Sequence, residues 1–188
     1  MSDKKKKINE FSIKELVSIS FFAVVIVICS MICIPGPVPL TFQTFAIFCT
    51  FGILGGRKGV WAVLVYILLG LTGLPVFSGF RGGVGALFGA TGGYIFGFVL
   101  SAAVYGIVIK LLGKSTIPAM IAAMTASHIL CYVTGTLWYL CIHAGGGDAG
   151  LVNALRYCVL PFILTDIIKI VMAAVTTDRV TRRLRLKN

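Results

Sequence analysis

The sequence predicts an all-α integral membrane protein, a single domain over residues 1–188 with six transmembrane helices and both termini in the cytoplasm. Of the 188 residues, 58% are hydrophobic and only 12% are charged, and the mean hydropathy is +1.00. Soluble domains of this size do not have that balance. The apolar residues also form runs, several of them long enough to cross a bilayer as a helix of roughly 20 residues.

Three apolar runs occupy the first part of the chain. The first ends at Pro35, because proline lacks the backbone N–H that a continuing helix needs. The second is short and closes at the sequence Gly-Gly-Arg-Lys, and the third stops at Pro75. We therefore expect helices at Leu16–Ile34, Thr41–Leu54 and Gly59–Leu74.

Three further runs follow after a glycine-rich loop. The fourth run is rich in small residues and ends before Gly113, the fifth follows a second proline-containing turn, and the sixth leads into a basic tail. The expected helices are Gly85–Leu112, Pro118–Cys141 and Val152–Val175.

A glycine repeat marks the start of the fourth run. Gly85, Gly89, Gly93 and Gly97 recur at every fourth residue, which places them on one helix face and lets a second helix approach closely. Two interpretations remain open. The stripe is a packing surface alone, or it forms part of a ligand site together with the flexible loop 78–85, whose backbone N–H groups can surround a ligand.

The basic residues indicate orientation rather than nucleic-acid binding. The formal net charge is +11, which in a soluble protein would suggest a nucleic-acid partner. Lys and Arg instead concentrate in the tails 1–15 and 178–188 and in alternate loops, as expected when these segments are cytoplasmic. Every Lys and Arg except Arg81, Arg156 and Lys169 then lies on the inner side. Membrane lipid is an expected partner of the tails, and nucleic acid is not.

Two charged residues interrupt the last apolar run. A charge at the centre of a membrane helix costs at least ~2.5–3.5 kcal/mol on insertion scales, so Asp166 and Lys169 are expected to face the interior of the bundle. Three residues apart, they share one helix face. They either form an ion pair that only joins helices, or they line a cavity and bind a small polar ligand, separating when it enters.

Three other polar residues have more than one possible role. Gln43, the only Gln of the chain, is expected at the outer start of the second helix, where it contacts a ligand, caps the helix or meets a headgroup. Arg81 is either solvated in its outer loop or binds an anionic ligand. His128, in the fifth run, is interpreted as a hydrogen-bonded core histidine rather than a proton relay or a ligand contact.

Motifs of enzymes and metal sites are not evident. Gly113-Lys114-Ser115 resembles the end of a phosphate-binding loop, but Val108 occupies the position of the required first glycine. The six cysteines show no Cys-x-x-Cys spacing, which favours core packing over metal binding or disulfides. We therefore expect no enzymatic activity, no catalytic residue, no metal and no cofactor.

Five segments carry motifs that match one known family in combination. They are Val38–Thr44, Gly52–Gly59, Gly70–Phe77, Gly89–Phe98 and Pro161–Lys169. With these motifs the chain resembles the BioY family, the biotin-specific substrate-capture (S) components of energy-coupling factor (ECF) transporters. The resemblance covers residues 38–174, nearly the whole chain.

The resemblance implies a multi-pass protein of a prokaryotic cell membrane that binds biotin from outside with high affinity. It also implies partners: a transmembrane coupling subunit and two cytoplasmic ATPase subunits, which reorient the S component so that biotin is released inside. Alternatives are an S component for another vitamin, a solitary proton-coupled carrier that titrates Asp166, or a small membrane acyltransferase.

The expected biotin-binding residues are Asp166, Lys169, Gln43, Phe77, Arg81, Gly82, Gly83 and Tyr94. Asp166 and Lys169 match the polar pair of the family's site, and the loop 79–85 with Tyr94 matches its lid and wall. In one arrangement Asp166 accepts from the ureido N–H groups while Lys169 or Arg81 binds the carboxylate. In the other, Lys169 donates to the ureido carbonyl. Phe77, Tyr94 and Trp138 are expected to cover the apolar parts of the ligand.

Overall fold

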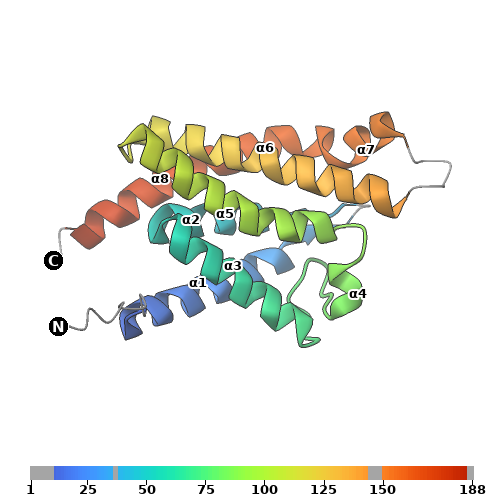
Figure 1. Cartoon of the computed structure of the whole chain (residues 1–188), viewed down its shortest axis with the longest axis horizontal. Coiled ribbons are helices and arrows are strands. Elements are labelled where there is room, and N and C mark those ends of the chain that lie inside the picture. Colours follow the sequence, from blue (N-terminus) through green and yellow to red (C-terminus); the bar gives the residue numbers. More distant parts are fainter. Residues whose placement is uncertain (1–10, 36–37, 144–149, 186–188) are drawn as a thin grey trace, which may run out of the picture.

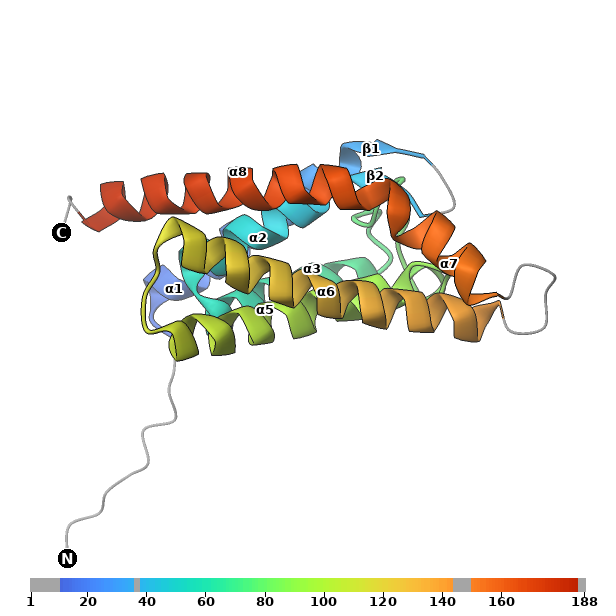
Figure 2. The same ribbon diagram turned by 90° about the horizontal axis from the view of Figure 1, so that it is seen from above.

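The computed structural model describes residues 11–35, 38–143 and 150–185, and the remainder of the two basic tails, 1–10 and 186–188, lies outside them. The described residues form an elongated helical bundle with one short antiparallel strand pair (Figures 1 and 2). The elements are α1 (Ile13–Met31), β1 (Cys33–Ile34), β2 (Leu40–Thr41), α2 (Gln43–Leu54), α3 (Gly56–Leu71), α4 (Val84–Leu87), α5 (Gly92–Leu112), α6 (Ile117–Ile142), α7 (Leu151–Cys158) and α8 (Leu160–Arg185).

Four of these helices are long and apolar enough to cross a membrane, namely α1, α5, α6 and α8. The second and third expected spans correspond to α2 and α3, which have 12 and 16 residues and are shorter than the roughly 20 residues of an upright span. The all-helical class is confirmed, whereas a six-span topology stays a prediction.

The expected fourth helix, from Gly85 to Leu112, is wrong at its start. The chain forms the single turn α4, leaves helical geometry at Phe88, and begins α5 only at Gly92. Gly89 accepts a backbone hydrogen bond from Gly92 at 3.0 Å, which closes the turn between the two helices. Hydropathy did not reveal this break because the turn itself consists of apolar and small residues.

The predicted glycine stripe is therefore divided. Gly85 and Gly89 precede α5, and open space surrounds the position of a Cβ at Gly85. Gly93 and Gly97 lie on α5 and face α6, where a Cβ at Gly93 would overlap Trp138 and lie 2.8 Å from the backbone oxygen of Thr134. Only the second half of the stripe is a helix–helix contact.

Replacing Gly93 with alanine is expected to destabilise the protein, while Gly85→Ala, from the same predicted stripe, is nearly neutral. The added methyl at Gly93 has no room against α6, and overpacking of this kind costs about 1–3 kcal/mol. Thermal unfolding of both variants in detergent measures the difference. Equal unfolding temperatures would show that α5 and α6 do not pack through Gly93.

The expected last helix, Val152–Val175, is also interrupted. α7 ends at Cys158, Val159 has non-helical φ −125° and ψ −58°, and α8 then runs from Leu160 to Arg185. Pro161 stands in the first turn of α8, where its missing N–H leaves no hydrogen bond unmade. The break turns α7 away from α8 (Figure 2).

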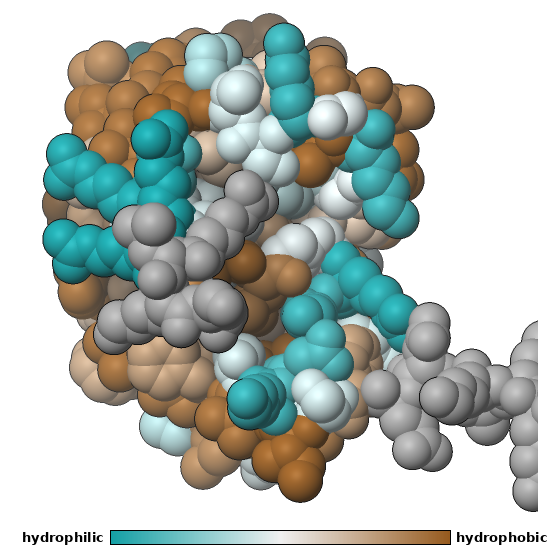
Figure 3. Space-filling view, turned by 90° about the vertical axis from the view of Figure 1, so that its left-hand side faces the viewer, coloured by the Kyte–Doolittle hydropathy of each residue, from teal (hydrophilic) through white to brown (hydrophobic). Residues whose placement is uncertain are grey.

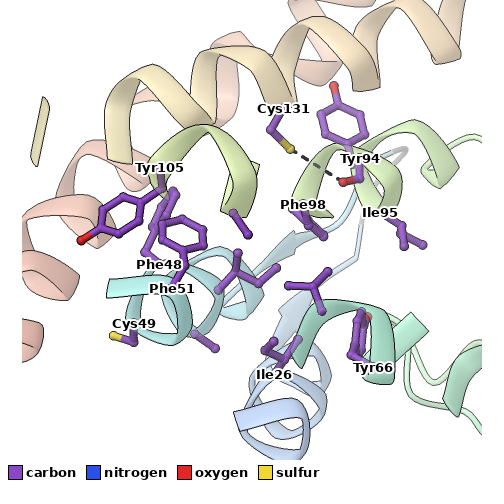
Figure 4. Close-up of a cluster of buried hydrophobic side chains, with 14 of the residues drawn as sticks. Ile26, Phe48, Cys49, Phe51, Tyr66, Tyr94, Ile95, Phe98, Tyr105 and Cys131 are labelled. Atoms are coloured by element: carbon purple, nitrogen blue, oxygen red, sulfur yellow. Dashed lines mark hydrogen bonds between the residues drawn. The ribbon is translucent and has the colours of Figure 1, made fainter. Parts of the chain in front are cut away.

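The core lies around α2, which contacts α1, α3, α5 and α8. Figure 4 shows Phe48 and Phe51 of α2 beside Tyr105 of α5, and the rings of Phe51 and Tyr105 have centroids 4.7 Å apart. The same cluster includes Tyr66, Tyr94, Phe98 and Cys131. It is continuous with the site described below, since those last four residues also line its cavity.

The start of α1 and the end of α8 lie at the same end of the bundle (Figure 1). Figure 3 faces this end and shows hydrophilic side chains surrounded by hydrophobic helix sides. An ion pair of 2.8 Å between Lys58 and Glu15 joins the starts of α3 and α1 here. The Arg182–Asp178 pair, 2.9 Å long, lies near the end of α8.

Candidate ligand-binding site

A cavity lies toward the opposite end, between the start of α2, the start of α5, the middle of α6 and the first half of α8. Its volume is about 60 Å³, several times the roughly 10–15 Å³ that one buried water requires. Five of the predicted site residues line it: Gln43, Phe77, Tyr94, Asp166 and Lys169. Helices separated by more than a hundred residues in sequence therefore contribute to one pocket.

Asp166 is the centre of a buried polar cluster. The residue is only 4% exposed. Oδ1 accepts hydrogen bonds from Lys169 Nζ at 2.9 Å and from Thr44 Oγ1 at 3.2 Å. Oδ2 accepts from Tyr132 Oη at 2.6 Å and lies 2.8 Å from His128 Nε2. With two partners on each oxygen, the carboxylate uses its hydrogen-bonding capacity fully.

This cluster joins three helices, because its members come from α2, α6 and α8. A buried carboxylate is tolerated only when opposite charge and hydrogen bonds compensate its lost hydration, and the contacts to Lys169, His128 and Tyr132 supply both. Lys169 has three N–H donors, and Asp166 is its one recorded acceptor within the described residues. The ammonium therefore retains donors for a ligand in the cavity.

His128 and Tyr132 contribute to this cluster, which sequence reasoning did not foresee. His128 was expected to be a hydrogen-bonded core histidine, and it is buried and hydrogen-bonded, but it also lines the cavity. Tyr132 follows four residues later on the same face of α6, and the two ring centroids lie 4.3 Å apart. Their i, i+4 spacing was the available signal, although only the fold reveals that Asp166 is their partner.

The remaining walls combine one amide with aromatic rings. Gln43 Nε2 donates to Tyr66 Oη at 2.9 Å. Tyr94 Oη donates to the backbone oxygen of Cys158 at 3.1 Å, which attaches the end of α7 to α5. Phe77 enters from the loop after α3. These apolar surfaces and a few polar groups are the usual composition of a small-molecule pocket.

Four residues expected near the ligand do not line this cavity. Arg81 is exposed, and its Nε donates to the backbone oxygen of Ser78 at 3.1 Å, which holds the guanidinium over its own loop. Gly82 packs on the carbonyl of Leu74, and Gly83 leads into α4. The indole N–H of Trp138 donates to the backbone oxygen of Gly89 at 3.0 Å, outside the pocket. The loop contributes Phe77 and Ser78 instead.

Comparisons with known proteins agree on one family. The family model of BioY matches residues 3–186. The "Biotin transporter BioY" of Thermotoga maritima is 36% identical over 171 residues, which cover 90% of this chain and 96% of the relative. "Biotin transporter BioY2" of Lactococcus lactis subsp. cremoris is 35% identical over 161 residues, 85% of this chain and 86% of the relative.

A solved structure also resembles the whole molecule. It is the S-component for biotin from an ECF-type ABC transporter, determined as a crystal structure at 2.1 Å. The TM-score is 0.81 at 25% sequence identity, with 97% of this chain and 95% of that chain covered.

Proposed function

The chain belongs to the BioY family, and on that premise we propose that it is the biotin-binding membrane component of an ECF-type transporter. It is a multi-pass membrane protein with transporters, not enzymes, as its relatives. The observation that carries the proposal is the buried Asp166–Lys169 pair, which His128 and Tyr132 complete beside an aromatic cavity. Ionisable groups inside a membrane bundle are rare and usually functional.

The proposed topology has six spans, with both termini in the cytoplasm. Its support is that Lys and Arg are frequent at the start of α1, the start of α3 and the end of α8, as the positive-inside rule requires. The end of the bundle where α1 begins and α8 ends is hydrophilic (Figure 3). The cavity lies toward the other end, where α2 and α5 begin. On this topology biotin enters the cavity from outside the cell.

Biotin offers a polar ureido ring, an apolar thioether ring and a carboxylate on an alkyl chain. Lys169 is proposed to donate to one of its two oxygen-bearing ends, while Phe77 and Tyr94 cover the apolar parts. A nanomolar affinity corresponds to about −12 kcal/mol. Charged hydrogen bonds worth ~1.5–3 kcal/mol each, together with burial of the rings, supply that range.

The hydrogen bonds of the Asp166 carboxylate support a role other than direct contact with the ligand. Because both of its oxygens already have two partners, it accepts from a ureido N–H only if one partner leaves. We therefore propose that its main task is to orient Lys169, His128 and Tyr132 toward the ligand. Separation of the ion pair on ligand entry would free Oδ1 of Asp166, so we propose instead that the pair stays formed while the remaining donors of Lys169 bind the ligand.

Release into the cell requires energy from partner subunits. The sequence Gly113-Lys114-Ser115 is not a complete nucleotide-binding loop, because Val108 stands where the first glycine is required. We propose a transmembrane coupling subunit and two cytoplasmic ATPases as partners, with reorientation of this chain in the membrane as the step that exposes biotin inward. Membrane lipid surrounds the apolar helix faces.

Purified protein in detergent is expected to bind labelled biotin tightly, with displacement by unlabelled biotin but not by riboflavin or thiamine. We expect this selectivity because the cavity is small and combines an ion pair with aromatic walls. Equilibrium binding measures this directly. Folded protein without biotin binding would refute the proposal, and displacement by riboflavin or thiamine would indicate an S component for another vitamin.

A further inference from the structure

The side-chain amide of Gln43 is buried, and only its NH2 group has a hydrogen-bond partner among the described residues. The residue is 5% exposed, lines the cavity, and donates from Nε2 to Tyr66 Oη at 2.9 Å. No group in the described residues is recorded as a donor to its carbonyl oxygen, Oε1, and that atom is not among the enclosed atoms without a partner. The bond to Tyr66 therefore leaves the carbonyl as a free acceptor on the cavity wall.

Tyr66 holds a second wall residue in addition to Gln43. It is fully buried on α3, and its ring meets that of Phe77 edge to face, with centroids 5.5 Å apart and an interplanar angle of 81°. Gly70, one turn later on α3, leaves the space that the Phe77 ring occupies, since an added Cβ there would overlap the ring. One face of α3 thus places both an amide and an aromatic ring against the cavity.

The loop that carries Phe77 has anchors of its own. Phe77 and Arg81 exchange backbone hydrogen bonds of 2.8 and 3.2 Å, and Gly83 donates to the backbone oxygen of Gly70 at 2.7 Å. Ser30 of α1 donates to the backbone oxygen of Val76 at 2.6 Å. Loss of the Tyr66 hydroxyl leaves the ring contact and the backbone anchors of the loop in place. It removes the partner of Gln43 together with an interaction with the Ser30 hydroxyl.

We propose that Tyr66 is a positioning residue that sets ligand specificity by holding the Gln43 carbonyl toward an N–H donor of the ligand. The proposal rests on the proposed function, in which that donor is a ureido N–H of biotin. Asp166 already has two partners on each oxygen. Among the described side chains that line the cavity, Oε1 of Gln43 is therefore the unoccupied carbonyl oxygen that can accept it. Lys169, which also lines the cavity, supplies donors to the same ligand.

The test compares Tyr66→Phe with wild type for biotin and for two analogues, each methylated on one ureido nitrogen. In wild type, the methyl that removes the donor to Gln43 is expected to lower affinity about tenfold more than the methyl on the other nitrogen, since it eliminates one hydrogen bond. In Tyr66→Phe this difference is expected to shrink to about threefold or less, and biotin itself to bind roughly three- to tenfold more weakly.

Two variants complete the experiment. Gln43→Met, which removes the amide but keeps the chain length, is expected to abolish the same difference even if Tyr66→Phe folds poorly. Tyr105→Phe, which removes the hydroxyl of a buried tyrosine outside the cavity, is expected to retain the wild-type pattern. An undiminished difference between the analogues in Tyr66→Phe and Gln43→Met would overturn the inference. Absence of biotin binding by wild type would instead refute the proposed function.

Discussion

Asp166→Ala is expected to abolish tight biotin binding, with a loss of affinity of several hundred- to several thousand-fold. The substitution removes the acceptor of four hydrogen bonds and leaves the Lys169 ammonium buried without its counter-charge. Truncating one partner of a buried, hydrogen-bonded charge pair at a binding site costs about 2–5 kcal/mol of binding free energy, here taken from the upper part of that range, and each ~1.4 kcal/mol is tenfold in affinity. Equilibrium binding of labelled biotin to the purified variant measures the loss.

A matched control for Asp166→Ala is Asp178→Ala. Asp178 also pairs with a cation on α8, Arg182, but the pair lies at the basic end of the bundle and the Arg182 side chain is 74% exposed. An exposed pair contributes about 0–1 kcal/mol, so this variant is expected to bind biotin as wild type does. Near-native affinity of Asp166→Ala would contradict the assigned role of the carboxylate.

The Asp166–Lys169 pair was predictable from sequence because ionisable residues within a long apolar run are rare and expensive to bury. Their spacing also fixed a common helix face, and they do form an ion pair of 2.9 Å on that face of α8. Whether the pair also binds a ligand is a separate question, because the same contact suits a structural role. The sequence identified the residues, and the comparisons identify the family.

The helix breaks at Phe88–Thr91 and Val159 were not predictable from hydropathy. Both lie inside apolar stretches, where a turn and a helix have the same mean hydropathy. What ends the helices is local geometry and packing: Gly92 fits against the carbonyl of Leu87, and Tyr94 bonds the backbone of Cys158. Such contacts depend on neighbours that the fold brings together.

The contacts of the site residues likewise depend on the fold and could not be predicted from the sequence. Arg81, the one basic residue of its outer loop, was expected either to be solvated or to bind an anionic ligand, and its position in the sequence does not determine where its side chain points. Phe80 adopts positive φ (57°) in the turn before it, and Arg81 bonds back to Ser78. Conversely, His128 and Tyr132 entered the cluster only because α6 lies against α8.

The second large effect distinguishes a ligand site from an ion pair that only joins helices. Lys169→Met alone leaves Asp166 without its cation and is expected to lower the free energy of unfolding by about 3 kcal/mol and to abolish biotin binding. The double variant Asp166→Asn/Lys169→Met removes both charges and keeps an amide oxygen for Tyr132 and His128. It is expected to regain stability but not binding, because replacing a buried pair with neutral groups is often neutral or stabilising.

Thermal unfolding and labelled-biotin binding, measured on both variants, separate the two roles. The control is Glu15→Gln/Lys58→Met, which removes a 2.8 Å pair whose side chains are about one third exposed, and which is expected to change stability by less than ~1 kcal/mol and leave binding intact. If the pair at 166 and 169 served only to join helices, the double variant would recover biotin affinity together with stability. If the double variant recovers stability but not biotin binding, the two buried charges serve ligand recognition.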